Sequence, residues 1–339
     1  MQTFAAIKKD LLPQEAARRI FSLIKSEMAL VEAEFERQAS SNVQVINYLG
    51  DYIRQSGGKR VRPALLVLAT HAVGGDGASD NSIRMATVME MLHTATLVHD
   101  DIIDNADTRR SRASVNAKFG NQAAVLMGDW LYMSGFETSL KERSLEILDI
   151  LTRLTRKMTE GELIQLTMIG NTAITREEYF DILRRKTAFL FSGCAEIGAI
   201  LGGSSHEEQV ALRDYGMNLG IAFQLADDLL DFTADSHAIG KAAGADLLEG
   251  KITLPLILLQ ESHPSVRPEL ERIMYDGVYN DGSRQLISAK LAEHGTLAEI
   301  REIALSFAGA ARKNLDILRE SEYRSALDEI PNFVIDRNT

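Results

Sequence analysis

Apolar residues recur along this chain at the spacing of helical turns. Around Ile83, Ala86 and Met91 the apolar positions fall three to five residues apart, and they continue at Leu97 and Val98. This period is typical of amphipathic helices, and the sustained alternation typical of strands is hard to find. The pattern predicts an all-α protein. Helices are expected near residues 12–39, 43–54, 60–73, 82–105, 120–140, 143–169, 176–201, 206–233, 252–262, 283–294, 297–319 and 322–332.

Residues that begin and end helices support these limits. Thr175 with Glu178, and Ser205 with Glu208, have the spacing of a capping box ahead of an amphipathic stretch. Helix stops are indicated by glycine at 74–75, 170 and 202–203.

The composition is that of an ordinary globular protein. Of 339 residues, 45% are hydrophobic and 25% are charged, with 24 Gly and 6 Pro, which excludes the disordered and low-complexity classes. The length allows about two domains. However, no linker rich in Pro, Gly or Ser divides the chain, and segments 86–103 and 216–232 are apolar on two faces, as central helices are. We therefore expect a single all-helical domain over residues 1–339, a large bundle around a central cavity.

The charge balance limits the possible partners. A net charge of −11 predicts a surface that repels nucleic acid and anionic membranes, so an anionic ligand needs a local basic patch.

Cys194 is the only cysteine, which excludes an internal disulfide and a multi-thiolate metal site. Charges interrupt the N-terminal segment, and the longest apolar run, Ile252 to Leu259, is far too short to span a bilayer. We expect a cytoplasmic protein with at most peripheral membrane contact.

Two acidic clusters of the form D-D-x-x-D interrupt otherwise apolar segments. They are Asp100, Asp101 and Asp104, and Asp227, Asp228 and Asp231. On a helix, the first and last aspartate of each cluster share a face, where their charges repel unless a cation compensates them. A solvated face usually explains a lone acidic triplet, but apolar neighbours such as Leu97 and Phe223 favour a metal site or a wet cavity here. Since the donors are all oxygens, Mg²⁺ is expected, and shared metals could hold a diphosphate between the clusters.

Short basic segments could hold an anionic substrate. The turn GGKRVRP at 57–63 combines backbone N–H groups with basic side chains at the start of a helix. It lacks the spacing of a P-loop, and taken alone a basic helix start explains it equally well. Further basic groups follow at 109–110, 184–186, 241 and 251.

Taken together, these segments resemble a known family. The strings GGKRVRP, LHTATLVHDDIIDNADTRR, RRKTAFLF, GIAFQLADDLLDF and GKAAGADLLEGKITLPL are similar, in this order, to the trans-isoprenyl diphosphate synthases, and among them the long-chain polyprenyl diphosphate synthases. The resemblance covers about residues 45–260. The chain departs from the common family pattern at three positions: it has Asn105 instead of an acidic residue, Ser111 instead of glycine, and Ala245 instead of a polar residue. None of these departures removes an expected catalytic group.

The resemblance implies a fold and a reaction. The fold would be an all-α bundle of the isoprenoid synthase type, and the protein a homodimer. The reaction would be the repeated head-to-tail condensation of isopentenyl diphosphate with an allylic diphosphate, farnesyl or geranylgeranyl diphosphate, to an all-trans polyprenyl diphosphate.

The resemblance also implies roles for individual residues. All six aspartates would hold about two or three Mg²⁺ ions, which Mn²⁺ could replace. The allylic diphosphate would be bound by Arg109, Lys186 and Lys241. The diphosphate of isopentenyl diphosphate would be bound by Gly58, Lys59, Arg62, His93 and Arg110. Thr187 and Gln224 would face the reacting carbons. His93 lies two helical turns before Asp100, on the same face, which agrees with its implied role.

Product length should depend on the depth of an apolar tunnel below the first cluster. Ala95 and Thr96 are small where short-chain members of the family typically carry aromatic residues, so the tunnel is expected to be open there. Its floor would then lie on the next helix. The candidates at helical spacing are Leu126, Trp130, Met133 and Phe136, although ordinary core packing explains any one of them equally well.

Two other functions stay open. A class I terpene cyclase also uses aspartate-rich metal motifs, but it has little need for a second diphosphate site. A non-catalytic subunit of a heteromeric prenyl synthase would normally have lost one of the two aspartate clusters, and both are intact here.

Overall fold

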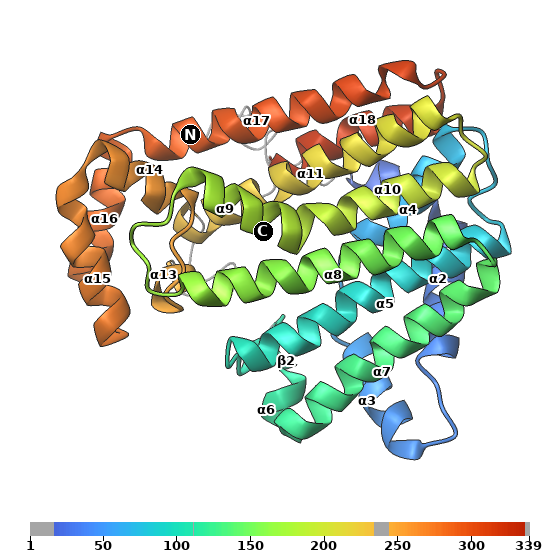
Figure 1. The fold of residues 1–339 in the computed structure, drawn as a ribbon, viewed down its shortest axis with the longest axis horizontal. Coiled ribbons are helices and arrows are strands. Elements are labelled where there is room, and N and C mark those ends of the chain that lie inside the picture. Colours follow the sequence, from blue (N-terminus) through green and yellow to red (C-terminus); the bar gives the residue numbers. More distant parts are fainter. Residues whose placement is uncertain (1–16, 111, 234–243, 336–339) are drawn as a thin grey trace, which may run out of the picture.

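The structure is a computed structural model that describes residues 17–110, 112–233 and 244–335. These residues are mostly helical, and the all-α expectation is confirmed (Figure 1). The α-helices are α2 (Lys25–Gln38), α3 (Gln44–Arg54), α4 (Val61–Ala72), α5 (Asp80–Ile103), α6 (Val115–Phe119), α7 (Asn121–Ser139), α8 (Leu145–Met168), α9 (Arg176–Leu183), α10 (Phe189–Leu201), α11 (His206–Thr233), α13 (Ala245–Leu248), α14 (Leu254–Ser262), α15 (Arg267–Asp276), α16 (Asp281–Glu293), α17 (Thr296–Asn314) and α18 (Glu322–Ile335). The shorter elements are strands β1 (Thr108–Arg109) and β2 (Arg112–Ala113), the 3₁₀ turns η1 (Leu140–Glu142), η3 (Pro264–Val266) and η4 (Leu315–Ile317), and the π-helix η2 (Arg184–Ala188).

Most of the expected helices are found within a few residues of their expected limits, and the exceptions have physical reasons. The helix expected over 176–201 is divided by η2, because a π-turn leaves no mark in the apolar period. The antiparallel hairpin β1–β2 is too short to produce an alternation. Helix α15 is absent from the expected helices. A proline stands in its first turn, where proline is favoured because its missing N–H costs nothing.

Both expected capping boxes are confirmed. The Thr175 hydroxyl accepts from the Glu178 backbone N–H, and the Glu178 carboxylate accepts from the Thr175 backbone N–H, at the start of α9. Ser205 and Glu208 exchange the same pair of bonds at the start of α11. These bonds satisfy N–H groups that have no partner within a helix.

Close approach of helix backbones sets the position of α11. Every residue of α10 from Leu190 to Ala199 is buried, and α10 packs against α4 and α11. A Cβ added at Gly216 would lie 2.5 Å from the Phe191 carbonyl oxygen, and one at Gly220 would lie 2.6 Å from the Ala188 Cα. Because glycine occupies both places, α11 lies against η2 and α10 almost backbone to backbone.

The helices surround a core that joins distant parts of the sequence. One apolar cluster runs from Ile20 to Val334 and includes residues of α4, α5, α8, α10 and α11. In Figure 1, α14, α15 and α16 form the left end of the molecule, and α3, α6 and α7 lie at the bottom. No helix in the described ranges is long and apolar enough to cross a membrane.

Candidate active site

The two aspartate clusters lie near the ends of two helices that face a common cleft. The first ends α5, with Asp104 as its C-cap, and the second lies in the last turns of α11. Asp100 and Asp227 both line a cleft of about 610 Å³. The structure therefore brings the two acidic motifs together across a space large enough for a ligand.

Most of the expected substrate-binding residues line the same cleft. They are Gly58, Lys59, Arg62, His93, Thr96, Arg109, Arg110, Lys186, Thr187 and Gln224. Lys241 and Ser111 lie outside the described residues. Four of the six aspartates are not part of the cleft wall, and each of those four is engaged elsewhere.

Asp100 lies where negative charge accumulates. Burial raises the pKa of its carboxyl to about 6, and Glu162 and Asp104 act in the same direction, while Lys186 and Arg109 oppose them. A bound cation would relieve this repulsion. In the described part of the chain, no three metal-ligating side chains converge on one point, so an ion here would take ligands from water or substrate as well. Mg²⁺ is typically bound in this way, through one or two carboxylates and substrate phosphates.

Asp101 is turned away from the cleft and holds an arginine. Its side chain is 3% exposed, and its Oδ1 accepts from Arg109 Nε at 2.7 Å and from Arg109 Nη2 at 2.6 Å. The expectation that Asp101 binds metal does not fit this geometry, because its carboxylate already has a cationic partner. Its contribution is to orient Arg109 at the edge of the cleft.

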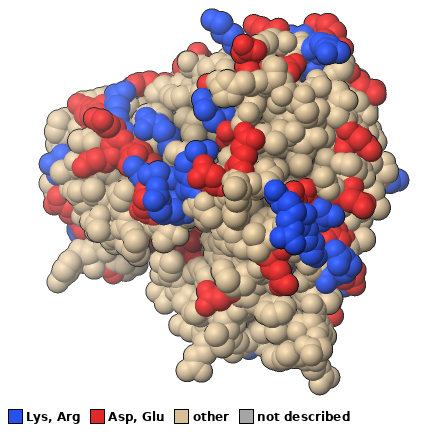
Figure 2. Space-filling model, turned by 45° about the vertical axis from the view of Figure 1, so that its right-hand side comes forward, with Lys and Arg blue, Asp and Glu red and all other residues tan. Residues whose placement is uncertain are grey.

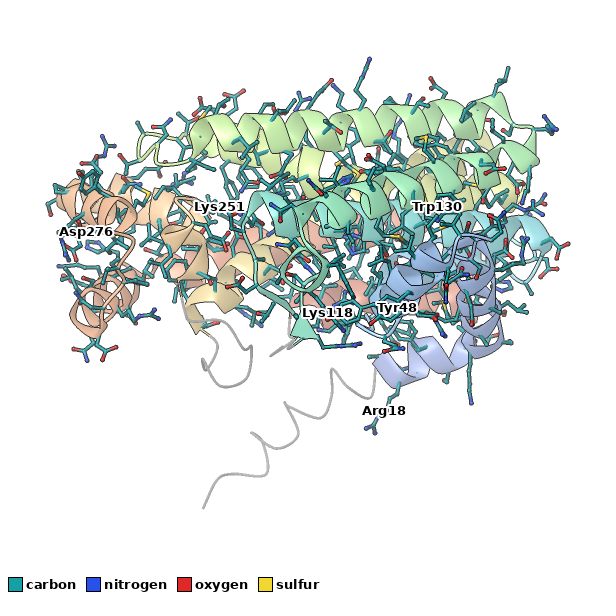
Figure 3. The ribbon with its side chains drawn as sticks, turned by 90° about the horizontal axis from the view of Figure 1, so that it is seen from below. Arg18, Tyr48, Lys118, Trp130, Lys251 and Asp276 are labelled. Carbon is teal, nitrogen blue, oxygen red and sulfur yellow. The ribbon has the colours of Figure 1, made fainter. Side chains whose placement is uncertain are left out.

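Asp104 and Asp231 link the clusters to the loop region before α14. Lys251 Nζ lies 2.9 Å from Asp104 Oδ1 and 2.7 Å from Glu249 Oε2. Asp231 Oδ1 accepts from the Ala245 backbone N–H at 3.1 Å. Figure 3 shows Lys251 between the group of α14, α15 and α16 and the longer helices of the bundle.

Asp228 is buried and does not line the cleft that Asp227 lines. It lines a second cavity of about 200 Å³, next to Tyr179 and Asp246. Burial raises the pKa of Asp228 to about 8, and Asp246 adds to this effect. Two side chains donate to its carboxylate, Tyr179 and Gln224. The expectation that Asp228 binds metal directly does not fit this arrangement either.

Arg62 is one of the cations that line the cleft. Its Nη1 donates to His93 Nε2 at 2.9 Å, its guanidinium lies 4.8 Å from the centre of the Phe191 ring, and its Nε is buried without a hydrogen-bond partner. Burial lowers the pKa of Arg62. Among the described residues Arg62 forms no ion pair with a carboxylate, so an anion in the cleft would supply what this cation lacks.

His93 supports Arg62 as a neutral imidazole. An arginine can only donate, so His93 Nε2 must accept and its proton must be on Nδ1. Burial and the nearby Arg62 and Arg110 hold the pKa of His93 well below its usual value. The family resemblance implies that His93 binds the diphosphate of isopentenyl diphosphate. In this structure His93 contacts Arg62, another residue of that expected site.

The turn that carries Lys59 is fixed from two sides. Arg60, with a left-handed backbone (φ 50°), donates to Glu32 at 2.5 Å and to Glu90 at 2.6 Å. Arg110, which is also left-handed, donates to the Gly57 carbonyl. Sequence reasoning missed Glu90, although it precedes His93 by one helical turn.

The expected tunnel residues divide into three groups. Thr96 lines the cleft, whereas Ala95 is fully buried in an apolar cluster with Leu131 and Trp130. Phe136 packs against the main core. The two remaining candidates for the tunnel floor lie on the outer face of α7: Leu126 is 68% exposed and Met133 is 62% exposed. That role does not fit them within a single chain.

Sequence reasoning also missed Tyr132, which lies where a tunnel floor was sought. Its ring stacks on His99, with the centroids 5.9 Å apart, and burial and the charge of Asp100 raise the pKa of its hydroxyl. Tyr132 is one of many apolar residues at helical spacing in α7, so the sequence pattern gives no reason to select it as a residue of the site.

Comparison with known proteins gives consistent similarities. The polyprenyl synthetase family profile matches residues 43–287. The octaprenyl diphosphate synthase of Haemophilus influenzae is 39% identical over 334 residues, which cover 98% of this chain and 99% of the relative. The structure of a decaprenyl diphosphate synthase from Rhodobacter capsulatus is 35% identical, with a TM-score of 0.89 and coverage of 95% and 99%. A polyprenyl synthase from Caulobacter crescentus, complexed with calcium and isoprenyl diphosphate, is 34% identical, with a TM-score of 0.89 and coverage of 95% and 98%.

The environment of Arg62 generates a binding prediction. In buffer containing a metal chelator, Arg62→Met should weaken the binding of inorganic pyrophosphate, measured by isothermal titration calorimetry, by about tenfold or more, since hydrogen bonds to a charged group are lost. Arg213→Met is the matched control, because it removes the same charge from a surface pair with Asp214 outside the cleft. Equal affinities of the two variants would contradict the assignment of Arg62 to an anion site.

Proposed function

Because this chain belongs to the polyprenyl synthetase family and is a long-chain trans-polyprenyl diphosphate synthase, we propose that its two substrates meet in the cleft between α5 and α11. One observation carries this proposal: a single cleft is lined both by carboxylates, Asp100 and Asp227, which we call its acidic side, and by cations, Lys59, Arg62 and Arg110, which we call its basic side. The two sides suit two diphosphates bound in different ways, one through metal ions and one through direct contact with cations.

The acidic side is proposed to hold the allylic diphosphate. Members of the family use a divalent metal, and we propose Mg²⁺, about two or three ions, with Mn²⁺ as a substitute. The carboxylates that line the cleft, Asp100 and Asp227, are the first candidates to hold these ions. Asp104 and Asp231, each one helical turn further along the chain, are the next candidates. When bound, the metal would neutralise the charge that develops on the departing diphosphate. The raised pKa of Asp100 supports this assignment, because burial and like charges leave this carboxyl in need of a cation.

Cations of the chain are proposed to complete the allylic site. Arg109 is oriented by Asp101, and Lys186 Nζ is held 2.7 Å from both Glu162 Oε2 and Gln165 Oε1. Both side chains line the cleft next to Asp100. Lys241, which the family resemblance adds to this set, lies outside the described residues.

The basic side is proposed to hold isopentenyl diphosphate. Lys59, Arg62 and Arg110 would contact its diphosphate, Gly58 would offer its backbone, and His93 would keep Arg62 in place. Restraint of this turn through Arg60 and Arg110 supports the assignment, since a site ordered in advance loses less entropy when a substrate binds.

The reaction needs charge stabilisation rather than a nucleophilic side chain. The bond between the allylic carbon and the diphosphate oxygen breaks, and its electron pair leaves with the pyrophosphate. The π electrons of isopentenyl diphosphate then form the new carbon–carbon bond, and loss of a proton from the adjacent carbon restores a double bond. The pyrophosphate just released is the proposed proton acceptor.

Side chains around the reacting carbons are proposed to protect the cation. Thr187 and Gln224 line the cleft, and Thr187 Oγ1 donates to Gln224 Oε1 at 2.9 Å. Apolar side chains of Met158, Leu190 and Phe223 also line it and would keep water away from the carbocation.

The activity itself is the first test. With Mg²⁺, farnesyl diphosphate and labelled isopentenyl diphosphate, the protein should yield elongated prenyl diphosphates, and Asp100→Ala should lower turnover by about a thousandfold or more, because metal-assisted charge stabilisation contributes several kcal/mol. Asp149→Ala, which removes a 73% exposed carboxylate from α8, is the matched control. A hydrocarbon product would indicate a cyclase, and no product would indicate a non-catalytic subunit. Activity of Asp100→Ala within a few-fold of wild type would contradict the metal site.

Product length is proposed to depend on the cleft wall below Asp100. Thr96 lies one helical turn before Asp100 and lines the cleft, so its small side chain leaves room for a growing chain. Ala95 packs behind it. An aromatic ring at position 96 would occupy space that a long product needs, while the charged groups at the reacting carbons stay in place.

Thr96→Phe should therefore shift the main product to shorter chains while the protein still elongates, as read by mass spectrometry of the products. Ala95→Phe should shorten the product as well, but with a lower melting temperature, since its ring must displace core side chains. Thr152→Phe, at an exposed position on α8, is the control for a ring of the same size. An unchanged chain-length distribution in Thr96→Phe would exclude a tunnel along this face of α5.

A homodimer through α7 is the proposed assembly. Leu126, Met133 and Leu140 recur every two turns and are all exposed. In Figure 2, the lower part of the molecule, where α3 and α7 lie, carries few charged side chains. A second copy of the chain on this face would bury the apolar stripe and would explain why side chains expected in the interior point outward.

Met133→Glu should convert the dimer into a monomer in light scattering coupled to size-exclusion chromatography, because a charge would be buried in an apolar interface. Tyr275→Glu is the matched control, since Tyr275 is 92% exposed on α15, at the opposite end of the molecule. If the Tyr275 variant alone dissociates, or if neither does, the interface lies elsewhere.

Two further features of the chain complete the proposal. We propose one domain for the whole chain, supported by the core cluster that joins residues near both ends of the described chain. A cytoplasmic location is proposed because the single thiol, Cys194, is buried and has no cysteine to pair with.

A further inference from the structure

Tyr179 contacts the second aspartate cluster from a neighbouring helix. It belongs to α9, seven residues before Lys186, and its ring is buried. Its hydroxyl donates to Asp228 Oδ2. No motif singled out this tyrosine, and the reaction described above does not use it.

Asp228 and Asp227 point in different directions. Successive residues on a helix are separated by about 100°, so two adjacent aspartates cannot face one ligand equally. Asp227 lines the large cleft, whereas Asp228 is 2% exposed and lines the smaller cavity beside Tyr179. Both oxygens of Asp228 already accept hydrogen bonds, Oδ2 from Tyr179 and Oδ1 from Gln224 Nε2 at 3.1 Å.

The hydrogen bonds continue to the residues at the reacting centre. Gln224 uses its amide nitrogen towards Asp228, so its oxygen is left to accept from Thr187 Oγ1 at 2.9 Å. Thr187 belongs to η2, directly after Lys186. The chain Tyr179, Asp228, Gln224, Thr187 therefore ties α9, α11 and η2 together at the point where the cleft and the smaller cavity share a wall.

We propose that Tyr179 is a positioning residue of this active site, which holds Asp228 as the internal anchor of the second aspartate cluster. This inference rests on the proposed function. Asp228 supports the fold of the site, and Asp227 next to it is thereby directed into the cleft opposite Asp100. Through Gln224 the same chain fixes Thr187, and with it the π-turn that presents Lys186 to the allylic diphosphate.

The test compares two buried tyrosines whose hydroxyl groups donate to different acceptors. Tyr179→Phe removes the bond to Asp228. Tyr215→Phe is the matched control, because Tyr215 is also buried, and its hydroxyl donates to the Leu327 carbonyl, away from the cleft. Both variants should lower the melting temperature, since each loses a buried hydrogen bond. Melting temperature, calorimetric binding of pyrophosphate with Mg²⁺, and the KM for each substrate are measured for both.

Tyr179→Phe should weaken the binding of pyrophosphate with Mg²⁺ by about tenfold and raise the KM for farnesyl diphosphate, as expected when one anchoring hydrogen bond is lost. Its KM for isopentenyl diphosphate should stay within about twofold of wild type, and Tyr215→Phe should leave all three constants unchanged. If Tyr179→Phe lowers the melting temperature but otherwise behaves like Tyr215→Phe, Tyr179 is merely structural and the proposal is wrong.

Asp228→Asn provides a second test that does not depend on Tyr179→Phe folding. An asparagine can still accept from Tyr179, so an anchor should survive in part, and the affinity for pyrophosphate with Mg²⁺ should fall only about tenfold. If Asp228 were a metal ligand, this variant would lose that binding completely, and such a loss would overturn the proposal. In the anchor account both substitutions act on the same hydrogen bond, so the double variant Tyr179→Phe, Asp228→Asn should lose less affinity than the product of the two single losses. An inactive wild-type protein would instead refute the proposed function.

Discussion

The cost of burying carboxylates is the constraint on which this site depends. Six aspartates stand in two apolar helices, and a buried charge is tolerated only when a partner compensates it. The partners are specific: Asp101 accepts from Arg109, Asp104 from Lys251, Asp228 from Tyr179 and Gln224, and Asp231 from the Ala245 backbone. Asp100 and Asp227 line the cleft from opposite helices. The acidic motif therefore contains two kinds of residue, those that build the site and those that face its ligand.

The fold makes this division possible by bringing helices unusually close. Glycines at 216 and 220 let α11 lie against α10 and η2, and this contact places Gln224 within reach of Thr187. On the other side of the cleft, the turn before α4 is fixed by Arg60, which connects it to Glu32 and to Glu90 on α5. Arginine in a left-handed conformation is uncommon, and its cost is offset by these ion pairs. The acidic and the basic sides are thus both ordered before a substrate arrives.

The sequence predicted the helices and the residues of the cleft because both depend on local periodicity and on motif spacing. It could not distinguish Asp101 from Asp100, or Asp228 from Asp227, because D-D-x-x-D gives the spacing of carboxylates but not which of them meets Arg109 or Tyr179. The exposure of Leu126 and Met133, where a tunnel floor was expected, could not be predicted for a related reason: α7 is apolar on more than one face, and the period does not say which face looks inward. Tyr179 and Glu90 were missed because they act through other residues.

The most direct measurement is a crystal structure of the protein with Mn²⁺ and pyrophosphate, in which anomalous scattering locates the metal. The account predicts manganese peaks at coordination distance from Asp100 and Asp227, with Asp101 still bound to Arg109 and Asp228 still bound to Tyr179. Direct coordination of manganese by Asp101 or Asp228, with loss of those protein partners, would contradict the division of the aspartates described here.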